Sequence, residues 1–223
     1  MSQQPYAVTS RAESVLSTNK LIRNTYTLLS MTLIFSAVMA GVSMTLNVPP
    51  LSPILTLIGY FGLFFVTAKL RNSIWGLVSV FALTGFMGFT LGPIISLYVQ
   101  AFSNGSQLVM LAMGGTGTIF LGLSGYALTT RKDFSFLAGF LVVGMLVAIL
   151  AMLGAWIFNI PALSLAISAM VIVLMSGYIL WQTSDMVHGY ETNYIMATIT
   201  LYVSIYNLFL SLLNLLAAFS GDN

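Results

Sequence analysis

Seven long, uninterrupted apolar stretches, separated by short polar breaks, constrain this chain more than any other feature of its sequence. A helix needs roughly 20 mostly apolar residues to cross about 30 Å of hydrocarbon. The stretches do not alternate with a period of two, as the strands of a membrane barrel would. The sequence therefore predicts an all-α polytopic membrane protein with seven transmembrane helices, near residues 25–46, 51–68, 74–99, 108–129, 136–158, 162–181 and 194–219.

The composition agrees with this class and excludes others. Only 5% of the residues are charged, whereas about 25% are charged in a soluble domain, so a soluble enzyme and a disordered chain are both excluded. A net charge of +2 provides no basic surface for nucleic acid. Because the chain has no cysteine, disulfides and thiolate metal sites are impossible. We expect no cofactor and no metal.

The distribution of basic residues predicts the orientation. With the amino terminus in the cytoplasm, all 7 basic residues lie on the cytoplasmic side and none on the other, as the positive-inside rule requires. Residues 1–24 lack the apolar core of a signal peptide and are expected to form a polar cytoplasmic tail. Residues 25–219 form the transmembrane domain, and residues 220–223 a short tail on the outer face, which is the periplasm in a bacterium.

Few ionisable groups lie near the membrane interior. Asp185 and His188 are predicted just past the sixth span and Glu191 just before the seventh, on the cytoplasmic rim. An ionisable residue within a span would indicate a functional site, but these residues lie where water can reach them, so solvated loop charges are the favoured explanation. One histidine and two carboxylates make a weak metal signal, since zinc sites use three or four ligands.

The seventh span carries a polar stripe. Its residues recur at intervals of three and four, so they share one face of a helix: Thr200, Ser204, Asn207, Ser211 and Asn214. In lipid such a face must meet another helix or line a water-filled cavity. Hydrogen bonding between helices and a wet interior are both compatible with this pattern.

Small residues and a proline mark two other spans. Gly114, Thr118 and Gly122 stand four apart, as small residues do where helices approach closely, and predict that the fourth span is central. Pro93, which follows Gly92, is the only proline well inside a predicted span. Because proline removes a backbone hydrogen bond, we expect a kink there, which is either purely structural or a hinge.

Two enzymatic interpretations lack the residues that they require. Gly122-Leu123-Ser124-Gly125 matches the nucleophile motif of rhomboid proteases, but His188 is the only histidine and is expected outside the bundle. A retinal protein needs a lysine in the last helix for its Schiff base, and the seventh span has none. We therefore predict that the chain is not an enzyme.

Several motifs together resemble the Bax inhibitor family of seven-helix membrane proteins, and in particular its bacterial YccA-like branch. The resemblance extends from about residue 15 onward, with the amino terminus in the cytoplasm. It rests on VLSTNKLIRNTYTLLSMTLIFSA from Val15, TGFMGFTLGPI from Thr84, LTTRKDFSFL from Leu128 and HGYETNYIMATITLYVSIYNLFLSLLNLL from His188.

The resemblance implies where functional residues should lie. Family members that act as pH-gated calcium leaks carry one aspartate near the end of the sixth span and another in the seventh. These positions fall on Gln182 and Ser204, so both acids are absent. The family's arginine falls on or near Lys69 or Arg71. Asp185, one turn from Gln182, replaces the missing acid only in part.

The resemblance also implies a partner. The YccA-like branch modulates FtsH, a membrane-anchored ATP-dependent protease, which makes FtsH and its associated complex the expected partner in the bacterial inner membrane. The polar tail suits a protease that grips a segment before pulling. The alternative is an ion leak, for calcium or protons. Its cavity would be lined by Ser204 and Asn207 and narrowed by Gln182, with Asp185 and Arg71 at the mouth.

Overall fold

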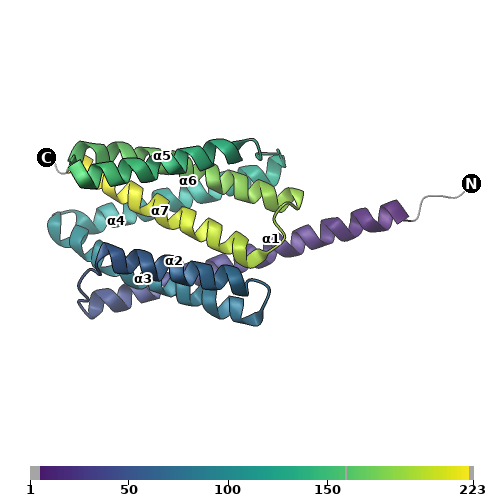
Figure 1. Cartoon of the computed structure of the whole chain (residues 1–223), viewed down its shortest axis with the longest axis horizontal. Coiled ribbons are helices and arrows are strands. Elements are labelled where there is room, and N and C mark those ends of the chain that lie inside the picture. Colours follow the sequence, from purple (N-terminus) through teal and green to yellow (C-terminus); the bar gives the residue numbers. More distant parts are fainter. Residues whose placement is uncertain (1–5, 159, 221–223) are drawn as a thin grey trace, which may run out of the picture.

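The computed structural model describes residues 6–158 and 160–220 and places them in seven helices joined by short loops (Figure 1). Each of these seven is long and apolar enough to cross a membrane, which confirms the predicted all-α architecture. The helices are α1 (Tyr6–Thr45), α2 (Pro53–Leu70), α3 (Ile74–Ala101), α4 (Gly105–Thr130), α5 (Leu137–Phe158), α6 (Pro161–His188) and α7 (Tyr194–Ser220).

Helix α1 is much longer than the predicted first span. It contains 40 residues, about 60 Å at 1.5 Å per residue, and its amino-terminal part projects beyond the rest of the bundle (Figure 1). Residues 6–24 contain neither glycine nor proline, the two residues that most oppose a helix. The segment expected as a polar tail is therefore helical from Tyr6, whereas residues 1–5 and 221–223 lie outside the described residues.

Helix α6 also extends beyond its predicted end, and this corrects the placement of two ionisable residues. The helix continues past residue 181 as far as His188, so Asp185 and His188 lie on α6 and not on a loop. It ends at Gly189, whose φ of 77° is left-handed, a conformation that glycine adopts without strain. The connection to α7, residues 189–193, is therefore only five residues long.

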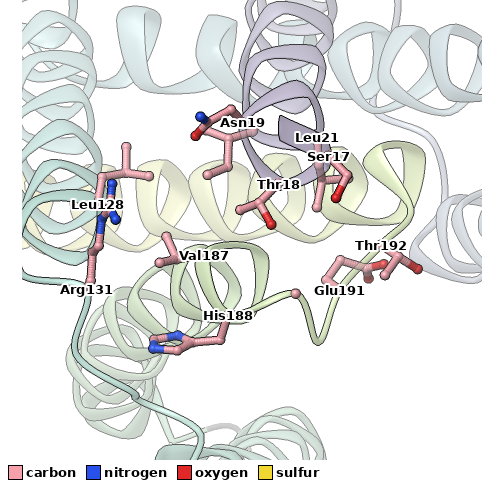
Figure 2. Close-up of a pocket in the computed structure, with 12 residues that line it drawn as sticks. Ser17, Thr18, Asn19, Leu21, Leu128, Arg131, Val187, His188, Glu191 and Thr192 are labelled. Atoms are coloured by element: carbon pink, nitrogen blue, oxygen red, sulfur yellow. The ribbon is translucent and has the colours of Figure 1, made fainter. Parts of the chain in front are cut away.

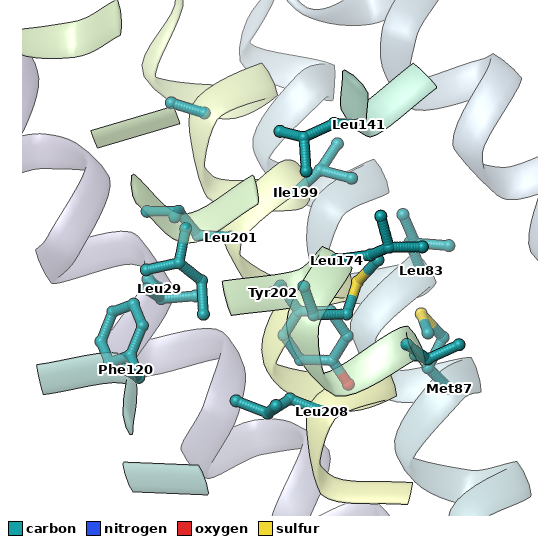
Figure 3. Packing of buried hydrophobic residues seen from close by; sticks show 14 of the residues in the cluster. Leu29, Leu83, Met87, Phe120, Leu141, Leu174, Ile199, Leu201, Tyr202 and Leu208 are labelled. Atoms are coloured by element: carbon teal, nitrogen blue, oxygen red, sulfur yellow. The ribbon is translucent and has the colours of Figure 1, made fainter. Parts of the chain in front are cut away.

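Helix α7 forms the centre of the bundle, and α2 and α5 lie at its periphery. Helix α7 packs against α1, α3, α4 and α6, whereas α2 packs mainly on α3 and α5 mainly on α6. The side chain of Tyr202, at the middle of α7, is fully buried among Leu83, Met87 and Leu174 (Figure 3). The apolar side chains exposed on α2 and α5 are those expected to face lipid.

The closest helix packing involves glycines of α3, not those of α4. Gly88 and Gly92 lie so near α1 that a Cβ at either would collide with backbone oxygens, those of Ser36 and Ala40. By contrast, a Cβ added at Gly114 or Gly122 would meet nothing within 4 Å, and both residues are exposed. The prediction that the small residues of the fourth span mediate close packing is therefore wrong, because their spacing defines a face but not its neighbour.

Pro93 lies in this same contact region. It is buried inside α3, and the helix continues through it from Ile74 to Ala101, so the expected kink at Gly92-Pro93 does not divide the helix. The neighbouring Gly92 instead gives α1 room to approach, since a Cβ there would overlap Ser43. The described contacts therefore give Gly92 a packing role.

Candidate functional site

The charged residues predicted at the cytoplasmic rim lie at one end of the bundle, called here the basic end. It contains the loops at residues 71–73, 131–136 and 189–193, together with the part of α1 that enters the bundle. Asn193 closes one side of this end: its side-chain Nδ2 donates to the Arg71 carbonyl oxygen at 3.1 Å and to Asn72 Oδ1 at 2.8 Å. Its Oδ1 also accepts from the backbone N–H groups of Ile195 and Met196, which caps α7.

A single buried serine fastens the α4–α5 loop to α6. The backbone N–H of Phe134 donates to Ser184 Oγ at 3.0 Å, and Ser184 Oγ donates to the Lys132 carbonyl oxygen at 3.1 Å. His188 Nδ1 donates to the Ser184 carbonyl oxygen at 2.9 Å, so this nitrogen carries the ring proton. The loop is thereby held against the last two turns of α6.

The same loop contains a carboxylate with a shifted pKa. The Ser135 backbone N–H donates to Asp133 Oδ1 at 2.8 Å, and this bond, with a further one from the Ser135 side chain, lowers the pKa of Asp133 below its usual value. A lowered pKa in the folded state means that the contact stabilises the loop at neutral pH. The contribution is lost as pH falls through the lowered pKa.

Arg131 begins this loop in an uncommon backbone conformation. Its φ of 50° and ψ of 29° are left-handed, which costs a non-glycine residue roughly 1–2 kcal/mol. Its backbone N–H donates to the Ala127 carbonyl oxygen at 3.1 Å and so ends α4. Residues held in this conformation cluster at functional sites, and Arg131 also lines the main polar cavity of the basic end.

That cavity, called here the basic-end cavity, has a volume of about 750 Å³ and lies between α1, the end of α4 and the α6–α7 loop. Figure 2 shows Arg131 and His188 on one side, Glu191 on the other, and Thr18 and Asn19 of α1 between them. It is therefore a polar cavity with charge of both signs on its walls. The remaining lining residues are Ser17, Leu21, Ile22, Leu128, Val187, Gly189 and Thr192.

About one helical turn deeper, the same three helices carry buried polar atoms without a hydrogen-bond partner. They are Thr25 Oγ1, Ser124 Oγ, Gln182 Nε2 and Asp185 Oδ1. Tyr26 ties the helices together at this level: its ring lies 6.0 Å from that of Phe120 on α4, and its hydroxyl lies 3.3 Å from Thr183 Oγ1 on α6. Buried polar groups normally have a partner, so this layer is suited to bound water.

The polar stripe of α7 makes hydrogen bonds within the protein. Ser204 is 2% exposed, and its hydroxyl donates to the Thr200 carbonyl oxygen. Asn207 likewise donates to the carbonyl oxygen of Val203, within its own helix. Asn214 connects two other helices, since it donates to Ser168 Oγ at 2.8 Å and accepts from the Tyr98 hydroxyl at 3.4 Å. Neither Ser204 nor Asn207 lines the basic-end cavity.

The two basic residues predicted from the sequence, Lys69 and Arg71, do not line the basic-end cavity. Lys69 and Arg71 are exposed at the α2–α3 connection, and helix α2 packs mainly on α3. The arginine that lines the basic-end cavity is Arg131. The site predicted from the sequence did not include Arg131. The motif LTTRKDFSFL places Arg131 and Lys132 next to each other on one short loop, but it was used only for the family resemblance.

The described part of the chain contains no group of three or more His, Cys, Asp or Glu residues placed to hold a metal ion. Two of the three candidates from the sequence, His188 and Glu191, are engaged in other ways. His188 is bonded through Nδ1 to Ser184, and Glu191 Oε1 accepts from the Asn193 backbone N–H at 2.7 Å.

The fold and the basic end define a class: a seven-helix membrane protein with a polar cavity at one end of a tightly packed bundle. The sequence model described as "Bax1-I: Inhibitor of apoptosis-promoting Bax1" matches residues 18–221. The chain therefore belongs to the Bax inhibitor family.

Three bacterial relatives match over nearly their whole length. The chain is 50% identical over 209 residues, 94% of each chain, to a protein of Escherichia coli strain K12 named "Modulator of FtsH protease YccA". It is 50% identical over 223 residues, all of each chain, to an uncharacterized protein of Pseudomonas aeruginosa. It is 43% identical over 224 residues, again all of each chain, to an uncharacterized membrane protein of Vibrio cholerae.

Proposed function

We propose that this chain is a non-catalytic protein of the bacterial inner membrane that binds an FtsH-type protease and restrains its action on other membrane proteins. The observation that carries the proposal is the 50% identity, across 94% of both chains, to a protein named as a modulator of FtsH. Such identity over nearly the whole length of both chains is expected to preserve the surfaces through which a membrane partner acts.

The projecting part of α1 supports a role as the segment that the protease engages. Helix α1 begins at Tyr6, and its amino-terminal part extends away from the bundle (Figure 1). An ATP-dependent protease needs an accessible segment to grip. A helical end that projects from a bundle opens readily, because the stability of a helix comes mostly from packing.

The packing of α1 supports slow extraction once the segment is gripped. Pulling on α1 would have to separate it from α3, where Gly88 and Gly92 bring the two backbones together. It would also break the contact between Ser36 and the buried Tyr202 at the centre of α7. A protein that is engaged readily but extracted slowly occupies the protease and so protects other substrates.

Co-purification tests the proposed association. The full chain, expressed at native level in cells with a tagged, proteolytically inactive FtsH, should co-purify with it from solubilised membranes. A variant lacking residues 2–15 should associate less, while Gly122→Leu, which alters an exposed position on α4, should associate normally. No association of the full chain would contradict the proposal.

A second candidate, an ion leak, is favoured by a different observation. The unpartnered atoms of Thr25, Ser124, Gln182 and Asp185 are suited to water beneath the basic-end cavity. Residues proposed to control such a path are Gln182 and Asp185 at this level, Ser204 and Asn207 deeper in α7, and Lys69 and Arg71 at the surface. The lack of acids at Gln182 and Ser204 argues against the proton-coupled calcium conduction that the family resemblance implies, so this function ranks second.

A further inference from the structure

The basic-end cavity carries a formal charge of each sign on its walls. Arg131, at the end of α4, is its positive group, and Glu191, on the α6–α7 loop, is its negative group. Figure 2 shows these two residues on opposite sides of the cavity. Within the part of the chain that the structure describes, neither side chain forms an ion pair. The protein therefore neutralises neither charge, and both are available to a ligand.

The backbone around Arg131 is held in place, but its guanidinium is not. The Arg131 backbone N–H donates to the Ala127 carbonyl oxygen at 3.1 Å, and the carbonyl oxygen of the next residue, Lys132, accepts from the buried Ser184 on α6. No described residue accepts a hydrogen bond from the Arg131 side chain. A guanidinium presents donors in a planar fork that matches two oxygens of a phosphate. This wall of the cavity is therefore suited to a phosphate group.

The opposite wall is suited to a cation. Glu191 Oε1 accepts from the Asn193 backbone N–H at 2.7 Å, which orients the carboxylate, and the other carboxylate oxygen has no hydrogen-bond partner among the described residues. Between the two walls, Thr18 and Asn19 of α1 line the cavity with a hydroxyl and an amide. A ligand that matches this arrangement has an anionic group at one end, a cationic group at the other and polar atoms between them.

The depth of the cavity in the membrane selects among such ligands. The candidate span of α4 ends at Thr130 and that of α6 at His188, while that of α7 begins at Tyr194. The cavity therefore lies where the hydrocarbon meets the lipid headgroups. Leu21 and Leu128 line it beside the polar groups, as a ligand with a polar and an apolar part requires. Basic pockets between membrane helices on the cytoplasmic side are known to bind the phosphorylated headgroups of lipids.

We propose that the basic-end cavity binds the phosphoethanolamine headgroup of one membrane phospholipid. Arg131 binds the phosphate and Glu191 binds the ammonium group, while Thr18 and Asn19 hydrogen-bond the atoms between them. A phosphatidylglycerol headgroup has the phosphate but no ammonium group, so it uses only the Arg131 wall. The site therefore selects phosphatidylethanolamine over phosphatidylglycerol, and the selection depends on Glu191.

Two substitutions remove one charge each and leave the surrounding hydrogen bonds in place. Glu191→Gln keeps an oxygen that can accept from the Asn193 N–H, so the α6–α7 loop should be unchanged. Arg131→Gln keeps the backbone bond to Ala127. Lys132→Gln is the matched control, since Lys132 is the next residue on the same loop, is exposed and does not line the cavity.

Native mass spectrometry of the protein, purified in mild detergent from vesicles of equal parts phosphatidylethanolamine and phosphatidylglycerol, identifies the retained lipid by its mass. The unmodified chain and Lys132→Gln should retain one phosphatidylethanolamine in preference to phosphatidylglycerol. Arg131→Gln should retain about tenfold less of both lipids, the scale of one hydrogen bond between charged groups. Glu191→Gln should retain phosphatidylglycerol as before but lose the preference for phosphatidylethanolamine.

The change in preference is the result that a purely structural role of Glu191 would not produce, because a distorted cavity would retain less of both lipids. Equal retention of the two lipids by the unmodified chain, or the same preference in Glu191→Gln, would overturn the proposal. So would retention of neither lipid by the unmodified chain.

Two further measurements distinguish the lipid from other sources of the same chemistry. Soluble phosphoethanolamine, added at the same concentration as the lipid, should displace little of it, because the soluble compound lacks the apolar part. Complete displacement would assign the cavity to a free ligand and overturn the assignment to a lipid. A benzoylphenylalanine placed at Leu128 and irradiated in intact membranes should yield an adduct with the mass of phosphatidylethanolamine, and less of it when Arg131→Gln is also present. An adduct with the mass of another protein in place of the lipid would overturn the proposal.

Discussion

The hydroxyl of Tyr202, at the centre of α7, lies 2.5 Å from Ser36 Oγ on α1. Because the same hydroxyl donates to the carbonyl oxygen of Thr84 on α3, this one side chain links three helices at the middle of the bundle. Removing it with Tyr202→Phe should destabilise the protein by about 0.5–2 kcal/mol, the range found for hydrogen bonds between membrane helices.

The specific test of that link is a double-mutant cycle with Ser36→Ala, measured by unfolding in mixed micelles. The two substitutions should be less than additive, because each removes the same hydrogen bond. Thr118→Ala is the control, since the Thr118 hydroxyl is bonded only to a carbonyl oxygen of its own helix and should change stability little. Full additivity of Tyr202→Phe and Ser36→Ala would show that the contact contributes nothing.

Gly88 on α3 should tolerate no side chain. A Cβ there would collide with the backbone carbonyl oxygen of Ser36, and backbone cannot move aside as a flexible side chain can. Gly88→Ala should therefore cost about 1–3 kcal/mol, as overpacking a core does, and should lower the yield of folded protein. Gly122→Ala, at an unobstructed position, should leave stability unchanged or slightly raise it. Equal tolerance at both positions would contradict the close approach of α1 and α3.

Ser184 should control how firmly the α4–α5 loop is held. Ser184→Ala removes both hydrogen bonds to the loop and leaves the backbone groups of Lys132 and Phe134 without them. Trypsin should then cleave faster after Arg131 and Lys132 in inside-out vesicles. Ser30→Ala, which removes a hydroxyl bonded only within α1, should cleave at the original rate. An unchanged cleavage rate in Ser184→Ala would mean that the loop is held by other contacts.

Calcium flux distinguishes the second functional candidate from the first. Neither Gln182 nor Ser204 can titrate between about pH 5 and 8, so the unmodified protein in liposomes should conduct little calcium, with only weak dependence on pH. Gln182→Asp combined with Ser204→Asp should introduce proton-linked behaviour. Gln182→Asn with Ser204→Ala is the uncharged control. A large pH-gated flux from the unmodified protein would show that the missing acids do not decide conduction.

The sequence was sufficient to predict the seven spans, because continuous apolar runs need no tertiary information. It could not show which helix face meets which neighbour: the spacing of Gly114 and Gly122 resembled a packing surface, yet that face is exposed, while Gly88 makes the close contact. Similarly, a hydropathy boundary near residue 181 could not reveal that α6 continues to His188, since polar residues at a membrane surface remain helical until Gly189 ends the helix.

The candidate site was predicted only in part for the same reason. Gln182 and Asp185 do lie together, one turn apart on α6, among buried atoms without partners. The other two residues with such atoms, Thr25 and Ser124, come from α1 and α4, and the arginine of the basic-end cavity, Arg131, comes from a loop. No sequence pattern indicates that α1, α4 and α6 meet here, as the contacts of Tyr26 with Phe120 and Thr183 show.

The decay of a membrane protein that FtsH degrades tests the central claim most directly. Its half-life should be measured after synthesis is stopped, in cells that lack this chain and its relatives, that contain the chain, or that contain the variant without residues 2–15. The account predicts that the substrate persists longer with the full chain than with no chain, and that the shortened variant loses most of this effect. An equal half-life in all three strains, with the full chain present in the membrane, would contradict the claim that this protein restrains the protease.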